Sequence, residues 1–126
     1  MLKPSLPKDS LERPVPLVWK GIFVEIVSRF ISGDYALSSR PVGVCEITPD
    51  RAEFIAAQIA SYGDDLIELS DETWSRSVYV WMDGYWEVII DLCMKDQGVS
   101  DLALLAKIYE GEDEKFIFKV ESVYVP

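Results

Sequence analysis

The dipeptide Asp83-Gly84 separates two runs of strand-forming residues, and it is the feature that most restricts how this chain can fold. Asp-Gly between alternating apolar runs is typical of a two-residue hairpin turn, because both central residues of that turn need a positive φ. A two-residue loop at this position also fixes the register and sets Trp81 opposite Trp86. The sequence therefore predicts an antiparallel hairpin within residues 77–94.

The side chains of this hairpin separate into two faces, because a strand alternates with a period of two residues. One face holds Tyr79, Trp81, Trp86, Val88, Ile90 and Leu92. The other face holds Val78, Val80, Met82, Tyr85 and Ile89, beside Glu87 and Asp91.

The second of these faces is more apolar than expected for a surface that meets water. A sheet covered by helices on one side normally alternates between apolar and polar residues, so its five large apolar residues indicate that something excludes water from it. We expect this face to be an interface, with a second copy of the chain as the default partner and a foreign protein as the alternative. The competing possibility is that residues 1–16 or 34–47 fold over it within the same chain.

Two helices are predicted before the hairpin. Over residues 17–32 the apolar side chains recur with helical spacing, which is typical of an amphipathic helix, and Gly33 ends it. Pro49 follows a threonine and precedes an aspartate, which is typical of a helix start, so a second helix is expected over 49–62.

The rest of the chain is predicted to be extended. Prolines in residues 1–16 disfavour regular structure, so an extended arm is expected there. Consecutive strand-type runs with short connections are typical of an antiparallel meander, and a change of apolar face near Glu121-Ser122 predicts a break in the last run. The expected strands are 77–82, 85–94, 102–110 and 116–125, with shorter ones at 42–47 and 64–69 and a helical turn at 71–74.

These elements predict an α+β fold in which two N-terminal helices pack on a curved antiparallel β-meander of four to five strands. A chain of 126 residues is large enough for one domain with its own core. The expected organisation is an arm over 1–16 and a single domain over 17–126.

The charge of the chain restricts its partners. Twenty-two acidic residues against twelve basic ones give a formal charge of −10, which repels nucleic acids and anionic membranes. A basic protein is the partner that this charge favours, and plain solubility is the alternative explanation. The sequence contains no long apolar run and no apolar leader near its start, so a cytoplasmic protein without a membrane segment is expected.

The absence of histidine dominates any search for catalytic chemistry. The usual general base, the commonest metal ligand and the standard catalytic triads are all missing. Asp91 is the best acid/base candidate, because it lies in an apolar run where burial would raise its pKa, but its position on the more polar face favours a structural role. Cys45 and Cys93 lack metal-ligand spacing and are expected to be free thiols. We therefore expect no metal and no organic cofactor. A non-catalytic protein is favoured, and a weak enzyme remains the alternative.

The aromatic residues leave open the alternative of a ligand pocket. Tryptophan and tyrosine side chains between helices and a curved sheet either fill the core or line a ligand pocket. The residues of the possible pocket are Tyr79, Trp81, Trp86, Asp91 and Tyr109.

Several short motifs of the sequence are similar to those of a known protein family. They are Gly33-Asp34-Tyr35, Thr73-Trp74 followed by Ser77, Trp81-Met82, Trp86, Asp91-Leu92, Gly98, Ser100-Asp101-Leu102 and the terminal Val123-Tyr124-Val125-Pro126. With these motifs the chain resembles a family of small bacterial single-domain proteins of unknown function, which implies a bacterial origin and no particular activity.

Two weaker resemblances rest on the general type of protein and not on sequence motifs. The order of helices and strands is similar to the nuclear transport factor 2-like fold, which implies N-terminal helices packed into a curved sheet. The pocket of that fold often holds an Asp and a His, and this chain has no His. A small, acidic α+β protein without histidine also resembles the immunity proteins that neutralise bacterial toxins.

Three functions remain at this point. The first is a non-catalytic, acidic protein-binding domain, such as an immunity-type inhibitor. The second is a small-molecule pocket or weak enzyme on the nuclear transport factor 2-like fold. The third is a homodimeric structural protein.

Overall fold

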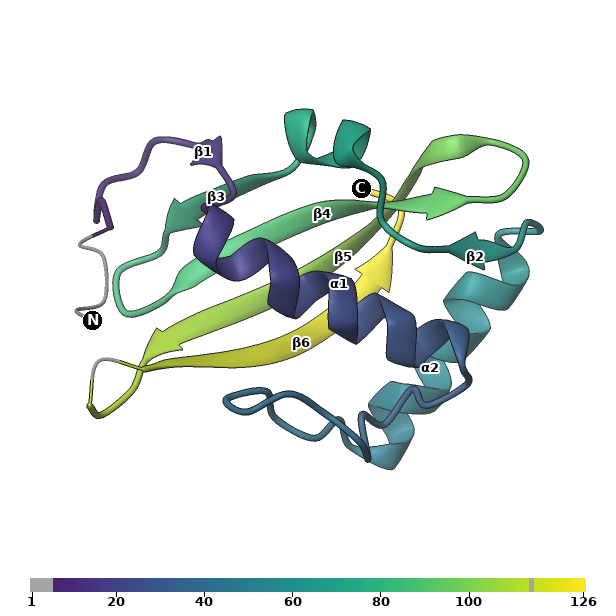
Figure 1. The fold of residues 1–126 in the computed structure, drawn as a ribbon, viewed down its shortest axis with the longest axis horizontal. Coiled ribbons are helices and arrows are strands. Elements are labelled where there is room, and N and C mark those ends of the chain that lie inside the picture. The colour runs from purple at the N-terminus through teal and green to yellow at the C-terminus, as the bar shows by residue number, and fades with distance from the viewer. Residues whose placement is uncertain (1–5, 114) are drawn as a thin grey trace.

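The computed structural model describes residues 6–113 and 115–126 and has the predicted α+β fold (Figure 1). Residues 1–5 of the predicted arm and residue 114 of the loop before the last strand lie outside the described residues. Helix α1 is Leu17–Ile31 and helix α2 is Pro49–Ser61, each within one residue of the predicted bounds. A short 3-10 helix, η1, covers Asp71–Ser75, where a helical turn was predicted.

The strands form one antiparallel, six-stranded sheet in the order β1-β3-β4-β5-β6, with β2 paired to β4. Four to five strands were predicted, and the additional one is a two-residue strand in the N-terminal arm. The four long strands follow one another as the predicted meander. The bounds are β1 Arg13–Pro14, β2 Leu66–Ile67, β3 Val78–Trp81, β4 Trp86–Met94, β5 Gly98–Glu110 and β6 Phe116–Tyr124.

The predicted hairpin joins β3 to β4, and its register is confirmed. Trp81 is opposite Trp86, and the N–H of Met82 donates to the carbonyl of Tyr85 at 2.8 Å. Asp83 and its neighbouring glycine have φ values of 59° and 135°, as the turn chemistry requires.

The predicted break in the last strand is a β-bulge. Leu105 pairs with Ser122 while Ala106 pairs with Val120, so Glu121 is the extra residue. Strand β5 begins at Gly98, four residues before the predicted start, because this polar stretch pairs with the end of β4.

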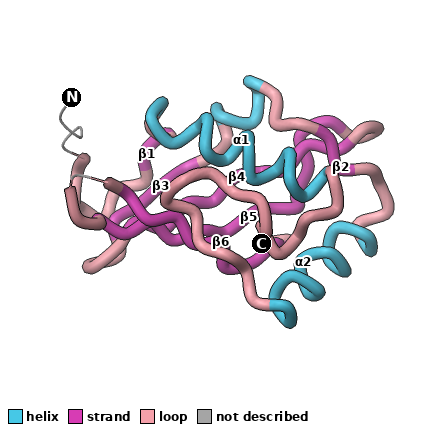
Figure 2. Tube along the Cα trace, turned by 60° about the horizontal axis from the view of Figure 1, so that its bottom comes forward, coloured by secondary structure: helices cyan, strands magenta, loops and turns pink. Residues whose placement is uncertain are grey.

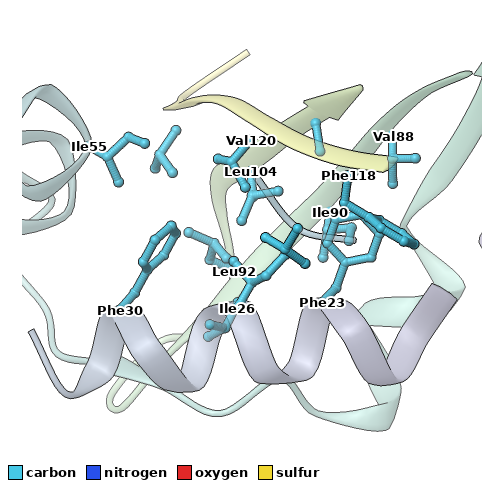
Figure 3. Packing of buried hydrophobic residues seen from close by; sticks show 14 of the residues in the cluster. Phe23, Ile26, Phe30, Ile55, Val88, Ile90, Leu92, Leu104, Phe118 and Val120 are labelled. Carbon is cyan, nitrogen blue, oxygen red and sulfur yellow. The ribbon is translucent and has the colours of Figure 1, made fainter. Parts of the chain in front are cut away.

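The core lies on one face of the sheet, which we call the inner face. Figure 1 shows α1 crossing the strands on this side and α2 beside the β6 edge, and Figure 2 gives the same arrangement from a second direction. Figure 3 shows Phe23, Ile26 and Phe30 pointing from α1 towards the sheet. They meet fully buried strand residues such as Ile90 and Leu104, and this single apolar layer holds the helices to the sheet.

Other parts of the chain protect both edges of the sheet. Strand β1 pairs with the outer edge of β3. On the opposite edge, the N–H of Phe118 donates to the Gly43 carbonyl at 2.8 Å, and the N–H of Cys45 donates to the Phe118 carbonyl at 2.9 Å. The strand predicted over 42–47 is therefore reduced to one bridge, between Val44 and Phe118.

A pair of glycine substitutions tests this edge contact. Gly43 has a φ of 91°, and an added Cβ would lie 2.8 Å from the Phe116 carbonyl oxygen. We expect Gly43→Ala to lower the free energy of unfolding by about 1–3 kcal/mol. Gly21 lies in α1, and a Cβ there would meet nothing within 4 Å, so Gly21→Ala should raise the free energy by about 0.5–1 kcal/mol. Denaturant unfolding of both variants measures the two changes, and equal effects would contradict the role of Gly43.

Candidate interaction face of the sheet

The side of the sheet opposite the core, which we call the outer face, carries all five residues of the predicted interface or its rim. Val78, Val80, Tyr85 and Ile89 are half-buried, and Met82, in the turn, is 43% exposed. Both helices lie away from this side (Figures 1 and 2). The described part of the arm pairs with the edge of β3, and residues 43–45 pair with the edge of β6. Within the described residues, the two segments thus pair with the edges of the sheet instead of folding over the outer face, which was the competing possibility raised from the sequence.

Pairing between strands arranges the outer-face side chains in rows across the sheet. The first row is apolar and lies at the end with the β3–β4 turn. The rings of Tyr85 and Tyr109 are 5.5 Å apart, and Tyr109 pairs with Ile117, which is 39% exposed. Together with Met82 these residues form a partly exposed apolar band.

The second row is charged. Glu87 is opposite Lys107, which is opposite Lys119. The Lys107 ammonium lies 3.3 Å from the Glu121 carboxylate and 4.9 Å from the centre of the Tyr85 ring. The hydrogen bond to Glu121 raises the pKa of Lys107, so this side chain is cationic and fixed over the sheet at neutral pH.

The third row is apolar again and lies deeper along the strands. It contains Val78, Ile89 and Leu105, which are paired in register and half-buried. Beyond it, the Arg76 guanidinium lies 3.0 Å from the Asp91 carboxylate. Burial raises the pKa of Asp91, while Arg76 acts in the opposite direction.

The outer face is electrically balanced although the chain is acidic. The carboxylates on or beside it are Glu87, Asp91, Asp101 and Glu121, and the cations are Arg76, Lys107, Lys119 and Arg51, which reaches Glu121 from α2, so four negative and four positive charges cancel. The formal charge of −10 is therefore carried by other surfaces. Residues 64–72 alone hold five acidic residues and no basic one.

The five residues of the possible pocket do not come together. Asp91 and Tyr109 lie on the outer face, whereas the other three lie on the inner face. Tyr79 and Trp86 are buried, with ring centres 5.2 Å and 5.7 Å from that of Trp19. Trp81 packs on Trp86 at 4.9 Å. These inner-face aromatic residues fill the core, in edge-to-face contacts typical of aromatic packing.

The N-terminal segment seals this aromatic cluster. The indole N–H of Trp86 donates to the Pro7 carbonyl at 3.1 Å. The ammonium of Lys8 lies 5.1 Å from the Trp81 ring centre and 2.5 Å from the Glu110 carboxylate. The described part of the arm thus packs against the core at one end of the sheet.

Two surface hollows are lined by other residues. One, of about 480 Å³, lies between the C-terminal ends of both helices and the segment that follows α2, and it is lined by Ile31, Tyr35, Ile59, Ala60, Gly63, Asp64, Asp65 and Leu66. The other, of about 320 Å³, is lined by Val18, Ile22, Val42, Gly43, Lys115, Phe116 and Phe118. None of the predicted site residues lines either hollow.

Metal-binding clusters and membrane-spanning helices are both absent from the part of the chain that the structure describes. Among residues 6–113 and 115–126, no group of three or more His, Cys, Asp or Glu side chains is placed to hold a metal ion. Within the same residues, no helix has both the length and the apolar character needed to cross a membrane. Cys45 and Cys93 are free thiols, and Cys93 is buried.

The sequence reasoning missed the half of the outer face that β5 and β6 contribute. Leu105, Lys107 and Tyr109 alternate with buried residues along β5, and this alternation was available as a signal. Their position beside Ile89, Glu87 and Tyr85 depends on the β4–β5 register, which no short turn motif fixes.

Asp91 provides a test of the electrostatics of this face. Its pKa is raised in the folded state, so its contribution to stability is fully present below the unfolded pKa and is lost as pH rises through the folded pKa. We expect Asp91→Asn to unfold at a higher temperature than the native chain at pH 7 and at the same temperature near pH 3. Asp96→Asn, in the exposed β4–β5 turn, should change neither value. Thermal unfolding at both pH values measures the effect, and a destabilised Asp91→Asn at pH 7 would show that the Arg76 ion pair dominates.

Comparison with known proteins places the chain in a family without assigning it an activity. No curated protein and no solved structure matches this chain. A family model described as a domain of unknown function, DUF7668, matches residues 27–126. This match covers α2, the last turn of α1 and every strand except β1, and it includes the whole outer face. The chain therefore belongs to the DUF7668 family of domains of unknown function.

Proposed function

We propose that this chain is a non-catalytic protein-binding domain and that the outer face is its contact surface. The observation that carries the proposal is the pair of apolar rows on a side of the sheet that neither helix covers. Side chains held on paired strands lose little conformational freedom when a partner covers them, which favours specific binding. Charged residues between the apolar rows add selectivity for a complementary surface.

The apolar surface of the outer face is large enough to contribute to binding but too small to sustain it without the charged residues. Seven apolar side chains lie in the two rows: Val78, Met82, Tyr85, Ile89, Leu105, Tyr109 and Ile117. If a partner removes roughly 50 Å² from each, the gain is about 9 kcal/mol. Association costs about 4–15 kcal/mol, so apolar burial and charge pairing must act together.

The other functions raised from the sequence have less support. An immunity-type inhibitor of a bacterial toxin is supported by the charge of −10, which attracts a basic protein at long range. A small-molecule pocket loses its proposed lining, because the five candidate residues divide between the two faces. A homodimeric structural protein would use the same outer face and is a special case of protein binding.

A photo-crosslinking experiment tests the proposal. Tyr85, on the outer face, and Phe54, which is 51% exposed on α2, are replaced one at a time by benzoylphenylalanine in cells that produce the chain. We expect a light-dependent adduct with a defined protein from position 85 and not from position 54. The adduct protein is then identified, purified and titrated with the native chain.

Two charge substitutions serve as the matched pair for that titration. Ile89→Lys places a charge in the third row, and Glu53→Lys places the same charge on an exposed position of α2. We expect Ile89→Lys to weaken binding more than tenfold, because it buries an unpaired charge in the contact, and Glu53→Lys to leave it unchanged. Equal crosslinking from positions 85 and 54, or equal affinities of the two variants, would overturn the proposal.

A further inference from the structure

We infer that the partner of the outer face is a second copy of this chain, packed face to face about a two-fold axis that runs parallel to the strands. Such a dimer presupposes the proposed function, because it requires the outer face to bind protein. The reasons lie in the charge of the face and in the order of its rows.

The charge balance of the face favours a copy of itself over a basic protein. The chain as a whole carries −10, yet the four acidic and four basic side chains on or beside the outer face cancel. A basic partner meets as many positive as negative groups here and is attracted instead to acidic surfaces such as residues 64–72. A second copy brings a neutral face with both signs, so the excess charge of each chain stays away from the contact.

The rows are self-complementary about an axis that passes between β4 and β5. Rotation about this axis exchanges β4 with β5 and β3 with β6, and it keeps each row at its own level along the strands. Residues that are paired between β4 and β5 within one sheet therefore face each other between two sheets, whereas β3 residues face β6 residues of the second copy. Glu87 meets the second copy's Lys107, and Ile89 meets the second copy's Leu105. Each contact occurs twice in the dimer.

Glu87 supplies the unsatisfied charge that this arrangement completes. Among the ion pairs of residues 6–113 and 115–126, Lys107 pairs with Glu121 and none includes Glu87. Glu87 is half-buried. It lies between Val80 on β3 and Lys107 on β5. A second copy's Lys107 gives this carboxylate a cation on the side that now faces water.

The dimensions of the face predict how tightly the copies associate. Four strands, spanned by the three rows and the Arg76–Asp91 pair beyond them, make a surface of roughly 20 Å by 25 Å, or about 500 Å² in projection. A standard complex buries about 800 Å² on each partner. We therefore expect a dimer that dissociates on dilution, with aligned sheets about 10 Å apart.

Molar mass in solution, measured by sedimentation equilibrium over a wide concentration range, tests the dimer. The native chain should rise from 14.3 kDa towards twice that mass with increasing concentration. Glu87→Lys and Lys107→Glu should each weaken self-association more than tenfold, because each places like charges opposite one another. Glu53→Lys and Lys95→Glu change the same charges at exposed positions away from the face and should associate like the native chain.

Mixing the two disruptive variants gives the sharpest result. A one-to-one mixture of Glu87→Lys and Lys107→Glu should recover association, because each chain then supplies the charge that the other lacks at both contacts. The double variant E87K/K107E should also dimerise alone. Thermal unfolding of every variant shows that a loss of association is not a loss of folding, which matters most for Lys107→Glu because it also removes the pair with Glu121.

Three outcomes overturn the inference. They are a native chain that stays monomeric at the highest concentration, a dimer that both single variants leave intact, and a mixture that fails to associate when each variant is folded. A different result overturns the proposed function: the crosslinker at position 85 captures only proteins that the crosslinker at position 54 also captures. A crosslink from position 85 to another protein, combined with a monomeric native chain, overturns only the second copy as partner.

Discussion

The antiparallel pairing of β4 with β5 is the interaction on which the rest of this structure depends. It is one of the two longest pairings in the sheet, and it joins the two strands that contribute most of the buried strand residues. Because side chains alternate, the pairing commits Val88 and Ile90 to the core and Glu87 and Ile89 to the opposite side. A slip of one residue would exchange these sets and place a carboxylate under α1. One register therefore determines both the core and the face that remains open.

Local patterns predicted the parts of the fold that depend on nearby residues. The Asp83-Gly84 turn fixed the β3–β4 register, the helical spacing fixed α1, and the change of apolar face located the bulge at Glu121. The missed parts depend on contacts between distant residues. Nothing near Pro7 indicates that its carbonyl accepts a hydrogen bond from Trp86, 79 positions away. For the same reason the sequence described only half of the candidate face, the half on the hairpin with a diagnostic turn.

The molecule separates its apolar and acidic surfaces. The outer face carries charges of both signs, two of them in the Lys107–Glu121 ion pair, whereas residues 64–72 carry only negative charge beside the β4–β5 turn. The Asp64 carboxylate accepts the N–H groups of Asp96 and Gln97, so acidic residues also help to hold that turn in place. Two molecules with a high net charge of the same sign repel each other. The repulsion is weakest in the orientation that brings their neutral faces together.

The protection of both sheet edges has a consequence for how such molecules assemble. Strand β1 occupies the edge of β3, and the backbone of residues 43–45 occupies the edge of β6. An exposed edge permits open-ended growth, since every added strand presents a new edge to the next molecule. Here the backbone groups at these positions are already used, so association through the side chains of one face ends after a single pairing. The fold therefore favours a closed assembly of defined size over a fibre.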